Sequence, residues 1–201
     1  MCIRDSNRHE VERIAQLGFE MALKRKRKLC CVDKANVLES SRLWRETIQN
    51  MESRFPDVKV SYEFVDAVAM RLIQWPSEYD VLVTSNLFGD ILTDEASVIS
   101  GSMGLMPSAS IGAKNALYEP IHGSFPQVAG KNIANPIGSI LSLAMMFEHS
   151  FNLEKESNII KQAVQNSLKE KITTQDITGN DKSYSTSDVG DFICNNINSF
   201  S

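Results

Sequence analysis

The order of apolar and amphipathic segments along this chain of 201 residues predicts an α/β protein. Short strand-like segments occupy residues 29–32, 58–65 and 79–84, and a helical pattern follows each of them. Alternating strands and helices of these lengths are typical of a parallel sheet with crossover helices. No Gly-x-Gly-x-x-Gly sequence follows a strand, so a conventional Rossmann domain is not supported.

The segment before the first strand predicts an amphipathic helix over residues 10–28. Its apolar residues recur at three- and four-residue steps, as on one buried helix face. The basic run of residues 24–28 is expected to close this helix, because cations in a last turn complement the helix dipole. A targeting or phosphate-binding patch is the alternative, and the acidic composition of the whole chain disfavours it.

Each strand-like segment ends at a polar turn that opens a helix. The helices after the three strands are expected over residues 38–54, 67–74 and 86–97. The turns that lead into them carry Lys34, Asp66 and Asn86. Because ligand sites in α/β sheets gather outside the carboxyl ends of the strands, these turns are the first candidates for chemistry.

The pattern changes beyond residue 100. Residues 101–112 are mostly small and suggest a domain crossover, and residues 119–135 suggest a loop rich in Gly and Pro. Helices are expected over residues 136–150, where Pro136 takes a first-turn position, and over residues 155–171 and 187–198. The chain is therefore expected to consist of a leader over residues 1–9, one α/β domain over residues 10–100 and a second over residues 101–201.

The composition indicates a small-molecule protein of the reducing cytoplasm. A formal net charge of −4 argues against general nucleic-acid binding. The four cysteines have no metal-ribbon spacing, and Cys30 and Cys31 would point to opposite faces of a strand. The longest apolar stretch, residues 137–147, falls well short of the ~20 residues that a membrane span requires. The N-terminus does not resemble a signal peptide.

Two aspartates near the start of the third of these helices form a candidate metal site. Asp90 and Asp94 are four residues apart, so both carboxylates lie on one helix face. Oxygen ligands suit Mg²⁺ or Mn²⁺. The simpler interpretation is that acidic residues in a first turn only stabilise the helix dipole. Asp66, at another strand end, strengthens the metal hypothesis, although by itself it would be interpreted as a helix cap.

Lys34 has the equivalent position after the first strand. An amine there can act as a general acid or base if desolvation or neighbouring charges lower its pKa, and a solvated loop lysine is the alternative. His122 lies in the sequence Pro-Ile-His-Gly-Ser and either contacts a nucleotide or satisfies the loop backbone. The absence of a P-loop sequence and of a Gly-x-Ser-x-Gly elbow weakens the NTPase and hydrolase alternatives.

Four ordered blocks of sequence resemble the metal-dependent β-decarboxylating dehydrogenases, the isocitrate/isopropylmalate dehydrogenase family. They are Val32–Leu38 with Ser41–Arg45, Val65–Met70, Asn86–Ala96, and Glu119–Ser124 running to Ile133–Pro136. The resemblance extends over about residues 10–190, and the lysine block is most similar to that of the members that oxidise isopropylmalate. It implies that family's fold of two α/β domains, with residues 10–100 contacting a second subunit and residues 101–201 belonging to the cofactor domain.

The resemblance also implies a reaction and its residues. The reaction is NAD-dependent oxidation of (2R,3S)-3-isopropylmalate with loss of CO₂, giving 4-methyl-2-oxopentanoate in leucine biosynthesis. Asp66, Asp90 and Asp94 would hold Mg²⁺ or Mn²⁺, Lys34 and Asp66 would serve at the reacting centre, and Asn36 would lie near the substrate or nicotinamide. In the family, the counterparts of Lys34 and Asp66 come from one chain and those of Asp90 and Asp94 from the other. A homodimer is therefore implied.

For the cofactor, the resemblance implies a set of residues along the NAD. They are Met103, Gly104, Glu119, His122, Gly123, Ser124, Asn135 and Asp188. One position departs from the pattern: many relatives place an aspartate where this chain has Gln127, and that aspartate accepts from the adenosine ribose. An amide can still bond a ribose hydroxyl but lacks the charge that repels a 2′-phosphate. NAD is still expected, because the Lys and Tyr of NADP-using relatives are missing.

The sequence also lacks features that the family carries upstream. These are several substrate-binding arginines, a catalytic tyrosine and the pocket for the isopropyl group. We therefore expect a truncated chain with two partial domains that does not turn over isopropylmalate alone. The alternatives are an isocitrate, homoisocitrate or tartrate dehydrogenase, a non-catalytic subunit of this fold, and a plain metal-binding α/β domain.

Overall fold

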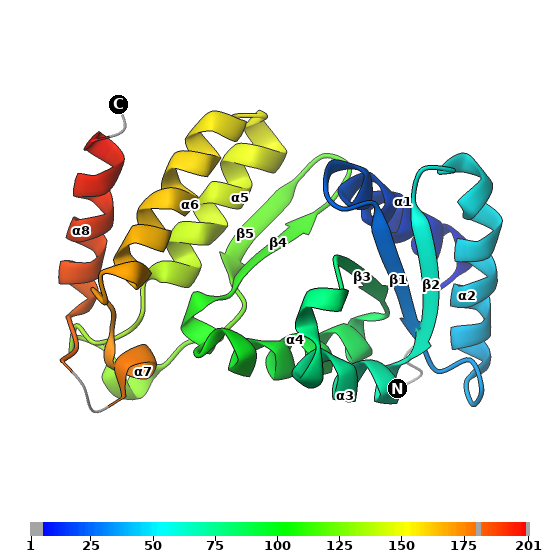
Figure 1. The fold of residues 1–201 in the computed structure, drawn as a ribbon, viewed down its shortest axis with the longest axis horizontal. Coiled ribbons are helices and arrows are strands. Elements are labelled where there is room, and N and C mark those ends of the chain that lie inside the picture. Colours follow the sequence, from blue (N-terminus) through cyan, green and yellow to red (C-terminus); the bar gives the residue numbers. More distant parts are fainter. Residues whose placement is uncertain (1–5, 180–181, 200–201) are drawn as a thin grey trace. The chain divides into compact units, whose positions relative to one another are not determined.

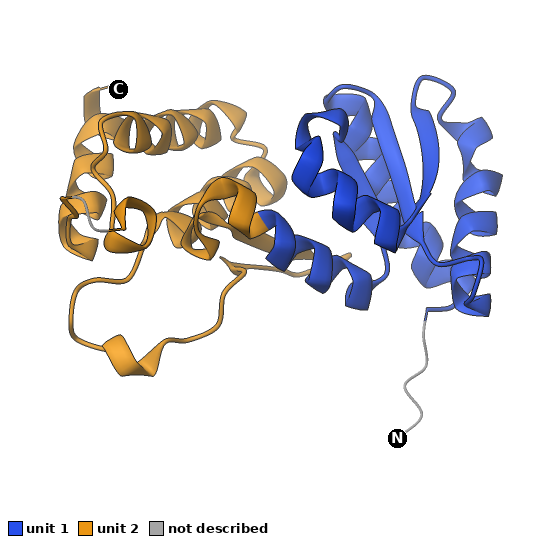
Figure 2. Cartoon of the chain, turned by 60° about the horizontal axis from the view of Figure 1, so that its bottom comes forward, with its two compact units in different colours: residues 1–96 blue, residues 97–201 orange. Residues whose placement is uncertain are grey.

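The chain forms two compact units, residues 1–96 and 97–201 (Figure 2). The computed structural model describes residues 6–179 and 182–199. Strands and helices alternate in the first unit, which confirms the α/β prediction. Across those described ranges, none of the helices has the length and apolar character needed to cross a membrane.

The first unit is built on a parallel sheet of three strands in the order β2-β1-β3 (Figure 1). The strands are β1 (Lys28–Asp33), β2 (Lys59–Phe64) and β3 (Val81–Thr84). The helices are α1 (Arg8–Lys24), α2 (Glu39–Met51), α3 (Val65–Gln74) and α4 (Asn86–Ser100). Because β1 pairs in parallel with both β2 and β3, the chain must cross over the sheet between consecutive strands. Helix α2 makes the crossover from β1 to β2, and α3 makes the crossover from β2 to β3.

The central strand β1 is buried on both faces. On one face Cys31 packs in a cluster with Phe19, which stacks on Phe55 with ring centroids 4.4 Å apart. On the other face Cys30 packs in a separate cluster with Val68. The prediction that the two cysteines point to opposite faces of a strand is therefore confirmed, and the apolar run of β1 is explained by burial on both sides.

Helix α1 begins at a capping box, inside the segment predicted as a leader. Asn7 Oδ1 accepts from the Glu10 backbone N–H at 3.1 Å, and Glu10 Oε2 accepts from the Asn7 N–H at 2.7 Å. These reciprocal bonds satisfy donors that a helix start leaves free, so the helix extends back to Arg8. Residues 1–5 of the predicted leader lie outside the described residues.

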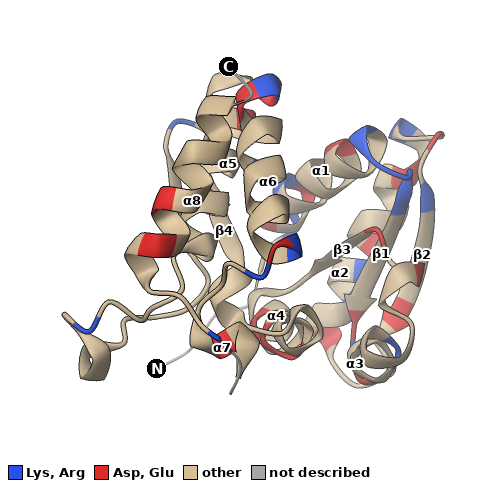
Figure 3. Cartoon of the chain, turned by 60° about the vertical axis from the view of Figure 1, so that its left-hand side comes forward, with Lys and Arg blue, Asp and Glu red and all other residues tan. Residues whose placement is uncertain are grey.

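The same helix ends at Lys24, so the prediction that it reaches residue 28 is wrong. Asp80, whose side chain is 1% exposed, accepts from Arg25 Nε and from the Lys26 backbone N–H, both at 2.8 Å. This carboxylate fixes a turn where the basic run was expected to continue the helix. Lys28 opens β1 instead, and basic residues gather at the amino ends of β1 and β2 (Figure 3).

The second unit packs helices against an antiparallel hairpin of two strands. The strands are β4 (Pro107–Ile111) and β5 (Ala116–Pro120). The helices are α5 (Ile137–Phe151), α6 (Glu154–Lys169), α7 (Gln175–Thr178) and α8 (Thr186–Ser199). Its core consists of Ile137, Ala163, Val164, Val189 and Ile193. The three long helices expected in this half of the chain are confirmed.

The hairpin corrects the prediction of a connector over residues 101–112 and a loop over residues 119–135. The strand β4 reads Pro-Ser-Ala-Ser-Ile, whose small residues give no alternation of apolar and polar side chains. Helix α5 lies close to the turn before the hairpin, since a Cβ on Gly138 would come within 3.0 Å of Gly104 O. A side chain at Gly138 would therefore be tightly packed against this backbone.

Candidate active site

The structure brings two of the predicted site residues together at the carboxyl edge of the parallel sheet. Lys34 follows β1 and Asp66 lies in the first turn of α3, just after the neighbouring strand β2. Lys34 Nζ donates a hydrogen bond to Asp66 Oδ1, and this ammonium holds the pKa of the Asp66 carboxyl below its usual range. Lys34 is largely covered, while Asp66 is 65% exposed and available to a ligand.

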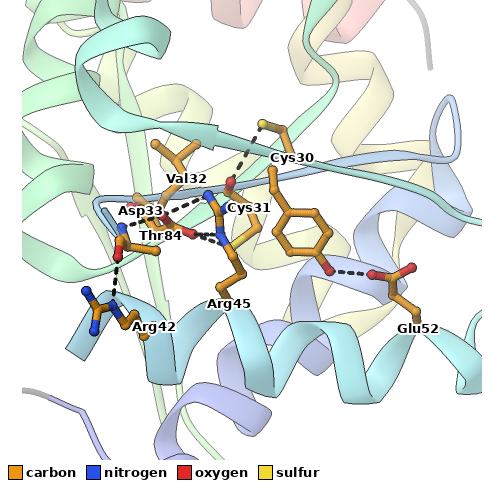
Figure 4. A network of polar contacts seen from close by, with 10 residues as sticks. Cys30, Cys31, Val32, Asp33, Arg42, Arg45, Glu52 and Thr84 are labelled. Atoms are coloured by element: carbon orange, nitrogen blue, oxygen red, sulfur yellow. Dashed lines mark hydrogen bonds and ion pairs between the residues drawn. The ribbon is translucent and has the colours of Figure 1, made fainter. Parts of the chain in front are cut away.

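The turn that carries Lys34 is held by polar contacts on both sides (Figure 4). Asp33, 1% exposed, receives a two-pronged ion pair from Arg45 and also accepts the Ala35 N–H at 2.9 Å. Asn36 is exposed in the same turn. Sequence reasoning passed over Asp33 and Arg45, because their pairing joins residues twelve positions apart that share no local pattern.

Asp90 and Asp94 lie one turn apart on α4, and both are exposed. Asn86 Nδ2 donates to Asp90 Oδ2 at 3.2 Å. Two carboxylates on one helix face fit a hard divalent cation as part of its ligand set. In the portion of the chain that the structure describes, no three His, Cys, Asp or Glu side chains gather closely enough to hold a metal ion. The prediction that Asp66 completes the site from a second chain stays a prediction.

A second site lies in the second unit, where a pocket of about 960 Å³ opens beside the loop that follows β5. Predicted cofactor residues that line it are Gly104, His122, Gly123, Ser124 and Asn135. His122 Nδ1 lies 3.0 Å from Gly123 O, so its ring is held against its own loop. The volume is in the range of small-molecule and cofactor sites, roughly 300–1,000 Å³.

Asp176 lies in one wall of this pocket, and no sequence pattern predicts it as a site residue. Asn135 Nδ2 donates to Asp176 Oδ2 at 3.0 Å, and the hydroxyls of Ser102 and Thr174 also donate to this carboxylate. Partial burial raises the pKa of Asp176, but these hydrogen bonds lower it more, so the pKa lies below its ordinary value. Asn135 Oδ1 in turn accepts the Ile137 N–H at 3.0 Å, which ties the pocket wall to the start of α5.

Five other predicted cofactor residues lie outside the lining of this pocket: Asn36, which belongs to the first unit, and Met103, Glu119, Gln127 and Asp188. Glu119 sits in β5 opposite Ser108. Asp188 accepts from the backbone N–H of Ser185 at 3.0 Å and from its hydroxyl at 2.7 Å. These bonds lower the pKa of Asp188 and cap the first turn of α8, so its visible role is structural.

Comparison with known proteins defines the class to which this fold and these sites belong. The profile of the family described as isocitrate/isopropylmalate dehydrogenase matches residues 1–193, and the chain belongs to that family.

Among curated relatives, the 3-isopropylmalate dehydrogenase of Thermotoga maritima is 52% identical over 189 residues, 94% of this chain and 53% of the relative. The enzyme of the same name from Bacteroides fragilis strain YCH46 is 54% identical over 188 residues, 92% of this chain and 53% of the relative. The chain thus spans about half the length of the curated relatives it matches.

Solved structures agree with this assignment. Isocitrate dehydrogenase from Methylococcus capsulatus superposes with a TM-score of 0.91 at 35% identity, over 97% of this chain and 58% of that one. A β-decarboxylating dehydrogenase from Thermococcus kodakarensis gives a TM-score of 0.87 at 37% identity, over 98% of this chain and 57% of that one. The family's fold, expected from the four sequence blocks, is confirmed.

Proposed function

We propose that the protein oxidises 3-isopropylmalate with NAD and releases CO₂, giving 4-methyl-2-oxopentanoate in leucine biosynthesis. One observation carries the proposal. A lysine ammonium is hydrogen-bonded to an aspartate at the carboxyl edge of a parallel sheet, in a chain about half identical to proteins named 3-isopropylmalate dehydrogenase. Lysine and carboxylate side chains at that edge suit proton transfer beside a bound hydroxy acid.

In this proposal, Lys34 in its neutral amine form would accept the proton that the substrate hydroxyl loses, and the hydrogen on the adjacent carbon would be transferred as hydride to NAD. Its contact with Asp66 keeps the amine at the edge of the sheet, where the substrate would bind. Asp66, Asp90 and Asp94 would hold Mg²⁺ or Mn²⁺. When bound, such a cation supplies Lewis acidity toward the oxygen that becomes a carbonyl. Asn36, exposed beside Lys34, would contact the substrate or the nicotinamide.

The pocket of the second unit supports the cofactor part of the proposal. It is lined by the loop around His122, which contributes apolar side chains such as Phe125 and Val128, and by Asn135, which Asp176 holds in place. We assign this pocket to NAD, with Met103, Gly104 and Glu119 nearby and Gln127 and Asp188 toward the adenosine. Gln127 is exposed, as a ribose contact requires.

A homodimer is part of the same proposal. Apolar side chains stand exposed on α3 and α4, including Met70 and Ile73 on α3 and Leu87 and Ile91 on α4, each at least 55% exposed. Exposed apolar side chains of this size, grouped on the two helices that carry Asp66 and Asp90, support burial against a second copy. We also assign the protein to the cytoplasm, where its buried free thiols Cys30 and Cys31 would stay reduced.

The function is tested by restoring the part of the enzyme that this chain does not cover. The chain is joined to the uncovered part of the Thermotoga maritima relative, and NADH formation is measured with isopropylmalate and Mg²⁺. Turnover that is lost in Lys34→Ala and in Asp90→Asn, but kept in Cys194→Ser, is the expected result. Turnover with isocitrate, homoisocitrate or tartrate instead would assign a different substrate. A joined protein that forms a dimer but turns over none of these substrates would favour a non-catalytic subunit.

The 201-residue chain by itself gives a second test. We expect no isopropylmalate-dependent NADH formation from it, since the chain spans about half the length of the relatives named 3-isopropylmalate dehydrogenase. We do expect NAD binding by calorimetry, weakened in Asn135→Ala. Robust metal-dependent NADH formation by the 201-residue chain alone would refute the expectation that it is inactive. Equal NAD binding by the unmodified chain and by Asn135→Ala would refute the assignment of the pocket to NAD.

A further inference from the structure

The carboxylate that precedes Lys34 is buried and clamped by one arginine. Arg45 Nε lies 2.8 Å from Asp33 Oδ2, and Arg45 Nη2 lies 3.0 Å from Asp33 Oδ1 (Figure 4). The Asp33 side chain is 1% exposed and that of Arg45 27%. A fork of two parallel hydrogen bonds fixes direction as well as distance, which a single ammonium cannot do.

The residue that follows Lys34 is held from the same helix. Asp33 Oδ1 accepts the Ala35 N–H at 2.9 Å, and Arg42 Nε donates to Ala35 O at 3.0 Å. Arg42 and Arg45 are three positions apart on α2, so they project from one face of that helix. The backbone is thus held by α2 immediately before and immediately after Lys34.

Aromatic side chains of β2 lie next to both the Arg45 guanidinium and the Lys34 ammonium. The Arg45 guanidinium carbon lies 5.5 Å from the Tyr62 ring centroid and 5.2 Å from that of Phe64. Lys34 Nζ lies 5.6 Å from the same Phe64 ring. Both cations therefore rest near one ring, and a displaced guanidinium would change the surface on which the lysine side chain lies.

We propose that Arg45 is a positioning residue, which acts through Asp33 to aim Lys34 along the carboxyl edge of the sheet. The catalytic meaning of this aim rests on the proposed function. An ion pair that is largely withdrawn from solvent is weak evidence of a stabilising role, and here its two hydrogen bonds fix the carboxylate next to Lys34. Because arginine keeps its charge at every working pH and its fork is rigid, it suits a permanent alignment.

The first test observes Lys34 itself in the full chain. Lysines are isotope-labelled at the ε-carbon, and the Lys34 resonance is assigned by its loss in Lys34→Arg. In the unmodified chain we expect this resonance to be displaced by the nearby Phe64 ring and its two ε-protons to differ, as in an immobilised side chain. Arg45→Lys keeps the charge and removes the fork, so both features should be lost.

Arg25→Lys is the matched control. Arg25 also pairs with an aspartate whose side chain is 1% exposed, Asp80, but at the opposite edge of the same sheet. We expect the Lys34 resonance to be unchanged in this variant. An unchanged Lys34 resonance in Arg45→Lys, or an equal change in both variants, would overturn the proposal. If Arg45→Lys does not fold, the Asp33→Asn/Arg45→Gln double variant replaces it, since it buries no unpaired charge, and the same outcomes decide.

The second test uses the joined enzyme described under Proposed function. We expect Arg45→Lys to lower kcat about 100-fold with KM changed by no more than about twofold, as for a misplaced catalytic group. Arg25→Lys should leave kcat near that of the unmodified enzyme, and an equal loss in both would overturn the proposal. If the unmodified joined enzyme shows no turnover, the proposed function fails, and the Lys34 resonance alone decides the role of Arg45.

Discussion

Replacing Gly104 with alanine should damage the pocket of the second unit at one defined point. A Cβ at this position would lie 2.7 Å from Asn135 Cβ and 3.0 Å from Asn135 Nδ2. The nearest atom is attached directly to the Asn135 backbone, so rotation of the side chain cannot relieve the clash. Asn135 must move, although its Oδ1 accepts the Ile137 N–H at the start of α5 and its Nδ2 donates to Asp176.

The magnitude follows from the contacts that this movement breaks. Overpacking by a single methyl group costs about 1–3 kcal/mol, and the loss of the Asn135–Ile137 hydrogen bond costs about 1 kcal/mol. We therefore expect Gly104→Ala to destabilise the second unit by about 2–4 kcal/mol. Weaker NAD binding should accompany the loss, because Gly104 and Asn135 both line the pocket.

The assay must separate the two units. Both tryptophans, Trp44 and Trp75, lie in the first unit, so their fluorescence reports that unit, while far-ultraviolet circular dichroism reports both. Denaturation of Gly104→Ala should shift the dichroism transition and leave the fluorescence transition in place. The control is Gly123→Ala, where a Cβ would meet nothing within 4 Å. A Gly104→Ala chain as stable as this control would refute the reasoning.

Three further predictions follow from other contacts. Gly18→Ala should stabilise the first unit by about 0.5–1 kcal/mol in denaturant titrations, because helix interiors disfavour glycine. A Cβ at this position has room, since its nearest contact, Leu29 Cδ1, lies 3.4 Å away. A loss of stability would contradict the prediction. An alkylating reagent should modify the exposed Cys194 in the folded chain and Cys31 only after unfolding, because Cys31 is buried and burial raises the pKa of its thiol. Mass spectrometry distinguishes the two sites, and labelling of Cys31 in the folded chain would contradict the prediction. The Lys161 ammonium lowers the pKa of Glu148 in the folded chain. This pair should therefore stabilise the second unit fully above the unfolded pKa of about 4.3 and lose its contribution as the pH falls through the lowered folded pKa. Glu148→Gln should remove that part of the acid dependence of stability in dichroism titrations, and an unchanged pH profile in this variant would contradict the prediction.

Strand-end reasoning located half of the candidate active site. The short apolar runs identified the three parallel strands, and the rule that ligand sites lie beyond their carboxyl ends brought Lys34 and Asp66 to one edge, where they are in contact. The alternation rule also assigned Cys30 and Cys31 to opposite faces, as the two core clusters show. These successes depend on local patterns, which a sequence displays directly.

Contacts between distant residues were beyond the reach of the sequence. Asp33 and Arg45 carry no periodicity that links them, and Asp176 sits in a short helix 41 positions away from Asn135. The small residues of β4 predict a connector, because they lack the alternating pattern of a strand. In each case the structure depends on tertiary packing between distant residues. The intrinsic propensity of single residues does not report such packing.

The central place of β1 has a consequence for how the protein folds during synthesis. Both of its partners lie later in the chain, and β3 ends 56 residues after β1 begins. At roughly 5–20 residues per second, the ribosome needs several seconds to supply them. Until β2 has been made, the apolar strand that leads to Lys34 has both hydrogen-bonding edges free, and until β3 has been made, one edge stays free. The nascent chain therefore exposes here an apolar strand edge to which a chaperone can bind.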